Sequence, residues 1–339
     1  MKHRFAELVS TGMYVPETEL SNAAIASRVS EEHREKVMKL ERSTGILRRF
    51  VAPDSWATSD LAVRAGQHAM ERAGVAAGDI DLIVLGTDSP DYITPATSVV
   101  VQHKLGATNA GTFDVGCACA SFPTALSAAA GMVATQPGIE TVLVIGAYMM
   151  RKLSDPKDPM AFFYGDGAGA AVLRASDTPG FMASAFRADG AYATYWNVAS
   201  GGTAEPASEA SVREGRTQVR INDNLPREIN DEGWPAVARQ VTERAGWTID
   251  EVDLFVFTQV RRGTIELVMK TLGAPVEKAQ FIMDRWGYTG SACVPMALHA
   301  AVEEGKVKVG AKVVLVGSGV GHNQAAVAVE ITRAMVGAR

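Results

Sequence analysis

The sequence predicts an α/β fold of five layers, α/β/α/β/α, built from two copies of one unit. The main observation is a repeat: ERAGVAAGDIDLIVLGT begins at Glu71 and ERAGWTIDEVDLFVFTQ begins at Glu243, 172 positions later. The same spacing relates PTALSAAA at 123 to PMALHAAV at 295, and TVLVIG at 141 to VVLVGS at 313. Three segments in one register indicate an internal duplication.

Each half follows the same order of elements. A helix ends at Gly74 or Gly246, which is typical of a left-handed helix stop, and an apolar strand follows. A helix of small residues and a second apolar strand complete the unit. Strands that alternate with helices predict parallel sheets covered by helices. The small residues of the second helix favour close packing, so we expect this helix of each half to lie between two sheets.

The two halves are predicted to be residues 1–175 and 176–339. Their join falls near the turn sequence DTPG at 177–180. The stretch SGGTAEPASEASVREG at 200–215 has no apolar periodicity, and we expect it to form an exposed excursion. Such an excursion is either a simple surface loop or a lid.

Composition and charge exclude several classes of protein. The 339 residues are 47% hydrophobic and 21% charged, with a net charge of −5, which does not favour nucleic acid as a partner. The N-terminus lacks a signal-like apolar segment, and no apolar run is long enough for a membrane span. The three cysteines do not form a disulfide framework, and the Cys-x-Cys pair lacks the second ligand pair of a zinc site. We expect a cytoplasmic protein with no metal.

The sequence FDVGCACASFPTALSAAA at 113–130 is the first candidate site. It predicts a strand, a tight turn and a helix, with Cys117 and Cys119 in the turn. A thiol there faces the positive end of the helix dipole, which favours the nucleophilic thiolate. The alternative is a buried cysteine that only packs.

Five segments resemble the β-ketoacyl-ACP synthase III family of the thiolase superfamily. They are RSTGILRR (42–49), FDVGCACASF (113–122), YGDGAGAAVL (164–173), MDRWGYTGSACVPMAL (283–298) and VGSGVG (316–321). The resemblance implies a thiolase-like fold, a homodimer, and acyl transfer from CoA or acyl carrier protein without a cofactor. It assigns Cys119 as the nucleophile. The oxyanion would be held by the Cys119 N–H and by an N–H in the Gly317-Ser318-Gly319 turn.

The chain departs from the family at two catalytic positions. The family's histidine position is Thr258, followed by a matching Gln259, and its asparagine position is Tyr288. In the family, these two groups polarise the thioester carbonyl of a malonyl extender. Threonine and tyrosine donate hydrogen bonds but do not titrate near neutral pH. Loss of one such donor typically costs about 10²–10³ in rate, so we expect impaired decarboxylation and retained acylation of Cys119.

The predicted substrate entrance also departs from the family. Ser43, followed by Thr44, occupies the position of an arginine that contacts the CoA adenine. Arg261 and Arg262 follow Gln259, where the family shows an asparagine and an apolar residue. Basic residues beside a pantetheine tunnel would suit a phosphate or an acidic carrier protein. Solvated surface charge is the alternative.

Two further residues are candidates for substrate binding. Thr94 aligns with a phenylalanine that crosses the subunit boundary and floors the acyl pocket, and a smaller residue would admit a longer or bulkier acyl group. His322 follows the glycine-rich turn and is the one histidine close to the site by sequence. It either approaches Cys119 or has a supporting role in its loop.

Three functions are compatible with these residues. The first is an acyltransferase or atypical condensing enzyme that passes the acyl group of Cys119 to a non-malonyl acceptor, in specialised metabolism. The second is a decarboxylating synthase III of fatty-acid or polyketide initiation, in which Thr258 and Tyr288 replace the usual donors. The third is a silent paralogue that supports an active partner in a heterodimer.

Overall fold

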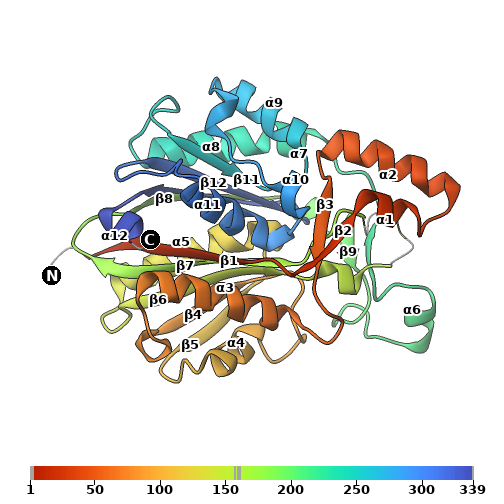
Figure 1. Ribbon diagram of the computed structural model, residues 1–339, viewed down its shortest axis with the longest axis horizontal. Helices are drawn as coiled ribbons and strands as arrows, with labels where there is room; N and C mark the ends of the chain where they lie inside the picture. The colour runs from red at the N-terminus through yellow and green to blue at the C-terminus, as the bar shows by residue number, and fades with distance from the viewer. Residues whose placement is uncertain (1–3, 156–157, 159–161, 338–339) are drawn as a thin grey trace.

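The computed structural model describes residues 4–155, 158 and 162–337 of the chain. Its first sheet has the strand order β1-β7-β6-β4-β5, in which β4 lies parallel to β5 and β6, whereas β7 runs antiparallel to β6 and β1 (Figure 1). The strands are β1 (Phe5–Tyr14), β4 (Leu82–Gly86), β5 (Gly111–Val115), β6 (Thr141–Tyr148) and β7 (Gly167–Ser176).

The second sheet has the order β11-β12-β13-β8, with β11 parallel to β12 and antiparallel pairs elsewhere. Two small antiparallel ladders, β2-β3 and β9-β10, lie outside the sheets. The strands are β2 (Thr18–Ser21), β3 (Arg48–Val51), β8 (Phe181–Ala188), β9 (Trp196–Val198), β10 (Val219–Ile221), β11 (Leu254–Phe257), β12 (Lys312–Gly319) and β13 (Asn323–Glu330).

Helices form the other three layers. Helices α5 and α11 contact strands of both sheets and lie between them, α3 and α4 cover the outer face of the first sheet, and α8 covers the second (Figure 1). The helices are α1 (Asn22–Ala26), α2 (Glu31–Thr44), α3 (Thr58–Ala73), α4 (Thr97–Leu105), α5 (Ser121–Thr135), α6 (Glu209–Arg213), α7 (Glu228–Asp231), α8 (Gly233–Arg244), α9 (Arg262–Leu272), α10 (Met283–Trp286), α11 (Cys293–Glu303) and α12 (Arg333–Gly337). The expected five layers are confirmed.

The repeat in the sequence is also a repeat in structure. Strand β4 begins at Leu82 and β11 at Leu254, while α5 begins at Ser121 and α11 at Cys293, so both pairs keep the spacing of 172. The helix stops at Gly74 and Gly246 have φ of 62° and 73°, as predicted for left-handed ends.

The central helix of the first half, α5, is strongly apolar. The expectation that no apolar run is long enough for a membrane span was wrong by length and composition for Ala118–Thr135, but 61% of this span is buried within the protein. Its small side chains allow β6 and β12 to approach it from opposite sides. It is therefore a core helix.

The excursion at 200–215 is more ordered than its sequence predicts. It contains the short helix α6, whose N-cap Ser208 accepts a hydrogen bond from the N–H of Ser211 at 3.1 Å. The segments on either side of it pair as the β9-β10 ladder, with Val198 opposite Val219. Both of these valines line the cavity at Cys119, so the base of the excursion covers the site.

Candidate active site

The turn that carries Cys119 is a short 3₁₀ segment, η2 (Ala118–Ala120), between β5 and α5. Ala118 has φ of 48°, a left-handed conformation that few residues other than glycine adopt. Such backbone strain concentrates at functional sites, where the surrounding structure enforces it. The turn places Cys119 at the wall of a cavity, where the residue is only 3% exposed.

A second turn of the same kind lies beside the first. The segment η7 (Gly290–Ala292) precedes α11, and Gly290 has φ of 42°. In the repeat of 172 residues, Gly290 corresponds to Ala118 and Ser291 to Cys119. The Ser291 hydroxyl donates to the carbonyl oxygen of Ala147 at 2.7 Å and lies 3.2 Å from Oδ1 of Asp88. The duplication thus brings one cysteine turn and one serine turn together.

Glycines of β12 allow this strand to pass directly over the cysteine turn. A Cβ on Gly319 would lie 2.4 Å from the carbonyl oxygen of Cys117 and 2.9 Å from the nitrogen of Cys119. A Cβ on Gly317 would lie 2.7 Å from the carbonyl oxygen of Cys119. Any side chain at either position would therefore displace the nucleophile turn, which explains the glycines of the VGSGVG segment.

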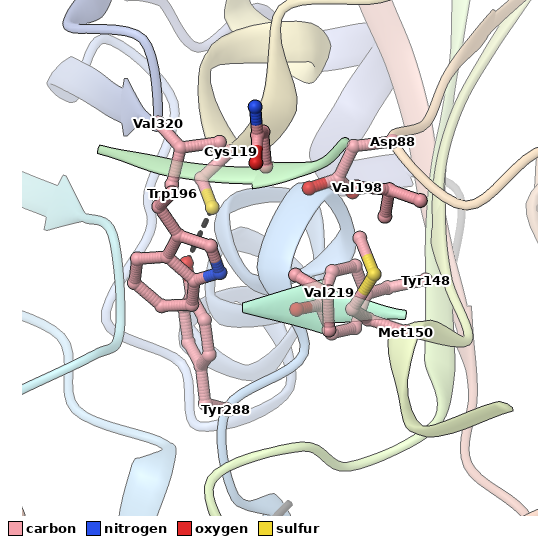
Figure 2. Close-up of a pocket in the computed structure, with 10 residues that line it drawn as sticks. Asp88, Cys119, Tyr148, Met150, Trp196, Val198, Val219, Tyr288 and Val320 are labelled. Atoms are coloured by element: carbon pink, nitrogen blue, oxygen red, sulfur yellow. Dashed lines mark hydrogen bonds between the residues drawn. The ribbon is translucent and has the colours of Figure 1, made fainter. Parts of the chain in front are cut away.

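The cavity at Cys119 has a volume of about 210 Å³ (Figure 2). Its wall is mostly apolar, with one carboxyl group, two phenols and one thiol. The Cys119 sulfur and the Tyr288 hydroxyl are joined by a short hydrogen bond across the cavity. The lining residues are Asp88, Cys119, Tyr148, Met150, Trp196, Asn197, Val198, Val219, Tyr288 and Val320.

The expected thiolate is not supported in the free protein. Burial raises the pKa of the Cys119 thiol well above its ordinary value, and the nearby Asp88 and Cys293 raise it further. The hydrogen bond from Tyr288 lowers that pKa but does not compensate. The helix dipole favours the thiolate, but this effect is outweighed here because it is small beside the loss of solvation in a closed pocket. Cys119 is therefore a neutral thiol before substrate binds.

The phenols around the sulfur are also held in their neutral form. Burial raises the pKa of Tyr288 and of Tyr148 well above their ordinary value, with further contributions from Cys119 and Asp88 respectively. The Tyr148 ring lies 5.9 Å from that of Tyr288 and 6.1 Å from that of Tyr164, measured between ring centroids. At neutral pH these hydroxyls act as hydrogen-bond donors and not as bases.

Comparisons with known proteins agree with this geometry. Residues 113–190 match the family described as 3-oxoacyl-[acyl-carrier-protein] synthase III, and residues 242–331 match its C-terminal part. A β-ketoacyl-[acyl-carrier-protein] synthase III of Syntrophomonas wolfei is 34% identical over 317 residues, covering 93% of this chain and 94% of the relative. One from Symbiobacterium thermophilum is 36% identical over 324 residues, covering 95% and 96%. This chain belongs to the β-ketoacyl-ACP synthase III family.

Solved structures confirm the thiolase-like fold of this synthase III family. The 3-oxoacyl-[acyl-carrier-protein] synthase III of Aquifex aeolicus has a TM-score of 0.83 at 28% identity, covering 96% of this chain and 99% of that one. A priming β-ketosynthase from a polyketide biosynthetic pathway has a TM-score of 0.87 at 30% identity, covering 98% and 97%. The chain is thus a member of a family of condensing enzymes.

Thr258, at the position where the resemblance to synthase III expects histidine, is turned toward the backbone of β12. Its hydroxyl oxygen accepts a hydrogen bond from the N–H of Ser318 at 2.9 Å. Thr258 is buried but is absent from the described cavity wall. The Ser318 N–H is therefore already satisfied, which leaves Gly317 and Gly319 as the predicted oxyanion donors of this segment. The predicted turn is wrong, because both glycines lie within strand β12 and are paired with β13. The roles of Cys119, Gly317 and Gly319 as backbone donors stay predictions.

Two residues predicted to bind substrate have structural roles instead. The side-chain nitrogen of Gln259 donates to the carbonyl oxygens of Phe257 and Gln280, each at 2.9 Å, and its oxygen accepts from Ile282 at 2.8 Å. The Thr44 hydroxyl is buried and donates to a carbonyl of its own helix, α2. Both side chains are occupied within the fold, which leaves them no free group for a ligand.

The structure brings the other predicted entrance residues together. Ser43 is exposed at the end of α2, and Gly45, just beyond it, packs against Arg262 at the start of α9. The Arg262 guanidinium lies 4.4 Å from the ring centroid of Phe281. Burial, and then the neighbouring Arg227, lower the pKa of Arg261. Arg227, Arg261 and Arg262 form a cationic surface. None of these three residues lines the described cavity.

His322 and Thr94 do not line the described cavity. His322 is buried with φ of 51°, and its ring lies 5.6 Å from that of Tyr192. Neither of its ring nitrogens has a hydrogen-bond partner within the described part of the chain. Thr94 is exposed in the single chain, so its predicted place in a partner's pocket, like the homodimer itself, stays a prediction.

Sequence reasoning missed Asp88, Tyr148 and Trp196. Asp88 and Tyr148 stand at the carboxyl ends of the neighbouring parallel strands β4 and β6, where α/β proteins commonly place functional side chains. That position was a usable signal. Trp196 carries no such signal, because it begins the short strand β9 beside an aperiodic segment.

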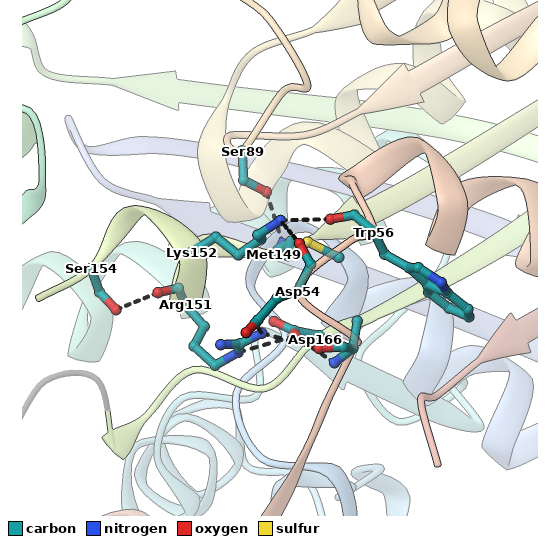
Figure 3. A network of polar contacts seen from close by, with 9 residues as sticks. Asp54, Trp56, Ser89, Met149, Arg151, Lys152, Ser154 and Asp166 are labelled. Carbon is teal, nitrogen blue, oxygen red and sulfur yellow. Dashed lines mark hydrogen bonds and ion pairs between the residues drawn. The ribbon is translucent and has the colours of Figure 1, made fainter. Parts of the chain in front are cut away.

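A polar network includes Met149 and Arg151 (Figure 3). These two residues flank the pocket residue Met150 in the chain. Nε of Arg151 lies 3.2 Å from Oδ2 of the fully buried Asp166, which also accepts the N–H of Ala52 at 2.8 Å. Lys152 donates to two backbone carbonyls of the loop before α3. The network joins three segments distant in sequence and fixes the chain that carries Met150.

We expect Arg151→Met to lower the free energy of unfolding by about 2–3 kcal/mol, because it leaves Asp166 without its ionic partner. Urea denaturation measures this change. Arg213→Met is the control, since Arg213 pairs with Glu209 on the surface, where the two side chains are 73% and 89% exposed. Such an exposed pair contributes less than about 0.5 kcal/mol. Equal losses in the two variants would contradict the assigned role of the network.

Proposed function

We propose that Cys119 takes an acyl group from acyl-CoA or acyl carrier protein and passes it to an acceptor other than a malonyl thioester. The observation that carries this proposal is the environment of the sulfur. Its partner is the Tyr288 phenol, and the described lining of the cavity contains neither a histidine nor Thr258. The side chains that would polarise a malonyl thioester are therefore replaced, while the turn and the glycines around Cys119 are kept.

The size of the cavity favours a compact acyl group. A protein cavity of about 150 Å³ is large enough for benzene, so a cavity of about 210 Å³ accommodates a short, branched or single-ring acyl chain. Its apolar wall, with Met150 and the two valines of the β9-β10 ladder, suits a hydrocarbon group. A long straight chain would require the ladder to move.

The arginines at the start of α9 support a thioester donor with a charged carrier. Arg261, Arg262 and Arg227 lie together, and within the described residues only Arg262 forms an ion pair, with Glu266 at 3.7 Å. The phosphates of CoA, or the phosphopantetheine and acidic surface of a carrier protein, would complement this charge.

A decarboxylating synthase III is the second candidate. It is favoured by the relatives that share 34–36% identity over nearly the whole chain and carry that name. In this case, Tyr288 would hold the malonyl thioester oxygen. A silent paralogue is a weaker candidate, because Cys119 retains both its strained turn and an adjoining cavity.

Intact-mass measurement with a panel of acyl-CoAs tests these functions. We expect acetyl-, isobutyryl- and benzoyl-CoA to leave an acyl adduct, and Cys119→Ala to form none. Cys117→Ala is the matched control and should acylate as the wild type does, because Cys117 lies outside the described cavity wall.

The acylated protein is then challenged with malonyl-ACP. We expect the adduct to persist without release of CO₂ and to be discharged by an amine, alcohol or β-keto thioester. Discharge with CO₂ release would establish the decarboxylating synthase instead. If no donor acylates the wild type, the silent paralogue would be favoured.

A further inference from the structure

We propose that Asp88 is the general base of this site, which takes the proton from the acceptor as the acyl group leaves Cys119. The inference rests on the proposed acyl transfer and names the group that makes its second half possible. Asp88 lies two residues beyond the end of β4 and lines the same cavity as Cys119 (Figure 2). It belongs to none of the segments that carry the family resemblance.

The carboxyl group of Asp88 is held by a hydrogen bond from another turn, and the chain beside it is fixed by further bonds. The Ser291 hydroxyl lies 3.2 Å from Oδ1, and Ser291 is itself fixed by its bond to the carbonyl of Ala147. The next residue, Ser89, accepts a hydrogen bond from the N–H of Met149 at 2.8 Å and donates its own N–H to Thr87 at 3.1 Å. The serine turn of the second half therefore positions a carboxyl group beside the cysteine turn of the first half.

Asp88 is the lining group best able to accept a proton at neutral pH. The other lining side chains of the described cavity are apolar, an amide, a thiol, an indole and two phenols. The thiol and the phenols are already protonated, because their pKa values are raised. Burial raises the pKa of Asp88 to about 6, against a smaller opposing effect of Ser291. The carboxylate therefore predominates at pH 7, yet it is a stronger base than an exposed aspartate.

The groups that face Asp88 do not neutralise it. Those that interact with its charge are Cys119, Cys293 and three tyrosines, and all of them are neutral acids with raised pKa values. No arginine, lysine or histidine belongs to the described lining of the cavity. An unpaired carboxylate in a small cavity is poorly solvated, which favours proton transfer from a bound acceptor.

The step balances without a further reactant. The acceptor oxygen or nitrogen attacks the thioester carbonyl carbon of acyl-Cys119, and its proton passes to the Asp88 carboxylate. The carbon–sulfur bond then breaks, and the sulfur leaves as a thiolate that accepts the hydrogen bond of Tyr288. The proton on Asp88 returns to the sulfur, which restores the thiol and the carboxylate. The product is the acylated acceptor.

Single-turnover discharge of the acyl adduct, with water as the acceptor, tests the proposal. The protein is acylated with acetyl-CoA, freed of excess donor, and followed by intact mass across a pH series. We expect the wild-type discharge rate to rise with pH and to level off above an inflection near pH 6, where Asp88 loses its proton. Asp88→Asn should still form the adduct but discharge it about 10²-fold more slowly and without this inflection.

Asp54→Asn is the matched control, because the Asp54 side chain is 95% exposed and lies outside the cavity. It should discharge as the wild type does. Discharge of the Asp88→Asn adduct at the wild-type rate would overturn the proposal. So would a wild-type profile without the inflection, a measurement that does not depend on whether the variant folds. Failure of the wild type to form any adduct would instead refute the proposed acyl transfer, and the base with it.

Discussion

Replacing Tyr288 by phenylalanine is expected to slow acylation of Cys119 by about 10- to 100-fold. The Tyr288 hydroxyl is bonded to the sulfur, and this bond opposes the rise in the thiol pKa that burial causes. A hydrogen bond to a charged group contributes about 1.5–3 kcal/mol, and its loss would disfavour the thiolate that attacks the donor. The rate of adduct formation with acetyl-CoA measures the effect.

A second measurement separates this role from simple packing. Alkylation of Cys119 by iodoacetamide depends on the thiolate, so its rate at a fixed pH of about 8, where the protein is still folded, should fall in Tyr288→Phe. Tyr14→Phe is the control, since Tyr14 lies on β1 and its ring contacts Arg64 instead of the sulfur. A variant at 288 that is acylated as fast as the wild type would show that the phenol only closes the pocket.

Stability is expected to fall steeply between about pH 8 and about pH 11. Five buried acids have pKa values raised by burial: Cys119, Tyr148, Tyr164, Tyr288 and Cys293. The folded protein holds these protons more tightly than the unfolded chain does. Below their unfolded pKa values both states are protonated and stability is unaffected, whereas above them the unfolded chain ionises first and unfolding is favoured.

The expected loss of stability can be calculated for one of these groups, Cys293. Burial raises its pKa from 9.0 to about 12, so it alone would remove about 2.5 kcal/mol of stability at about pH 11. Thermal unfolding across the pH series measures the total. Cys293→Ala should make the slope shallower by about 1.4 kcal/mol per pH unit, the contribution of one proton. A melting temperature that is constant up to about pH 11 would show that folding does not raise the pKa values of these groups.

The duplicated fold was predictable because its helices and strands follow from short sequence patterns that occur twice in the chain. The helix stops at Gly74 and Gly246, the apolar strands and the small-residue helices recur at one spacing, and each depends mainly on near neighbours in the chain. The short helix α6 was missed because one turn of helix, capped by Ser208, leaves no apolar periodicity.

The site was only partly predictable. Cys119 could be assigned from its turn and from resemblance, and Tyr288 from an aligned position. Their direct hydrogen bond joins residues 169 positions apart and has no local signal. The same holds for Asp88, whose contact with Ser291 spans 203 positions.

The amino-acid sequence was sufficient to predict a duplicated α/β chain with a cysteine at a strand-to-helix turn. The strands, the helices and the turn could each be predicted because each depends mainly on residues close together in the chain. The protonation of that cysteine was decided only when the chain closed around it. Burial, two phenols and a carboxyl group from distant strands now surround the sulfur. Removal of water from a charged group outweighs a helix dipole, and the amount of water removed depends on the packing of both halves.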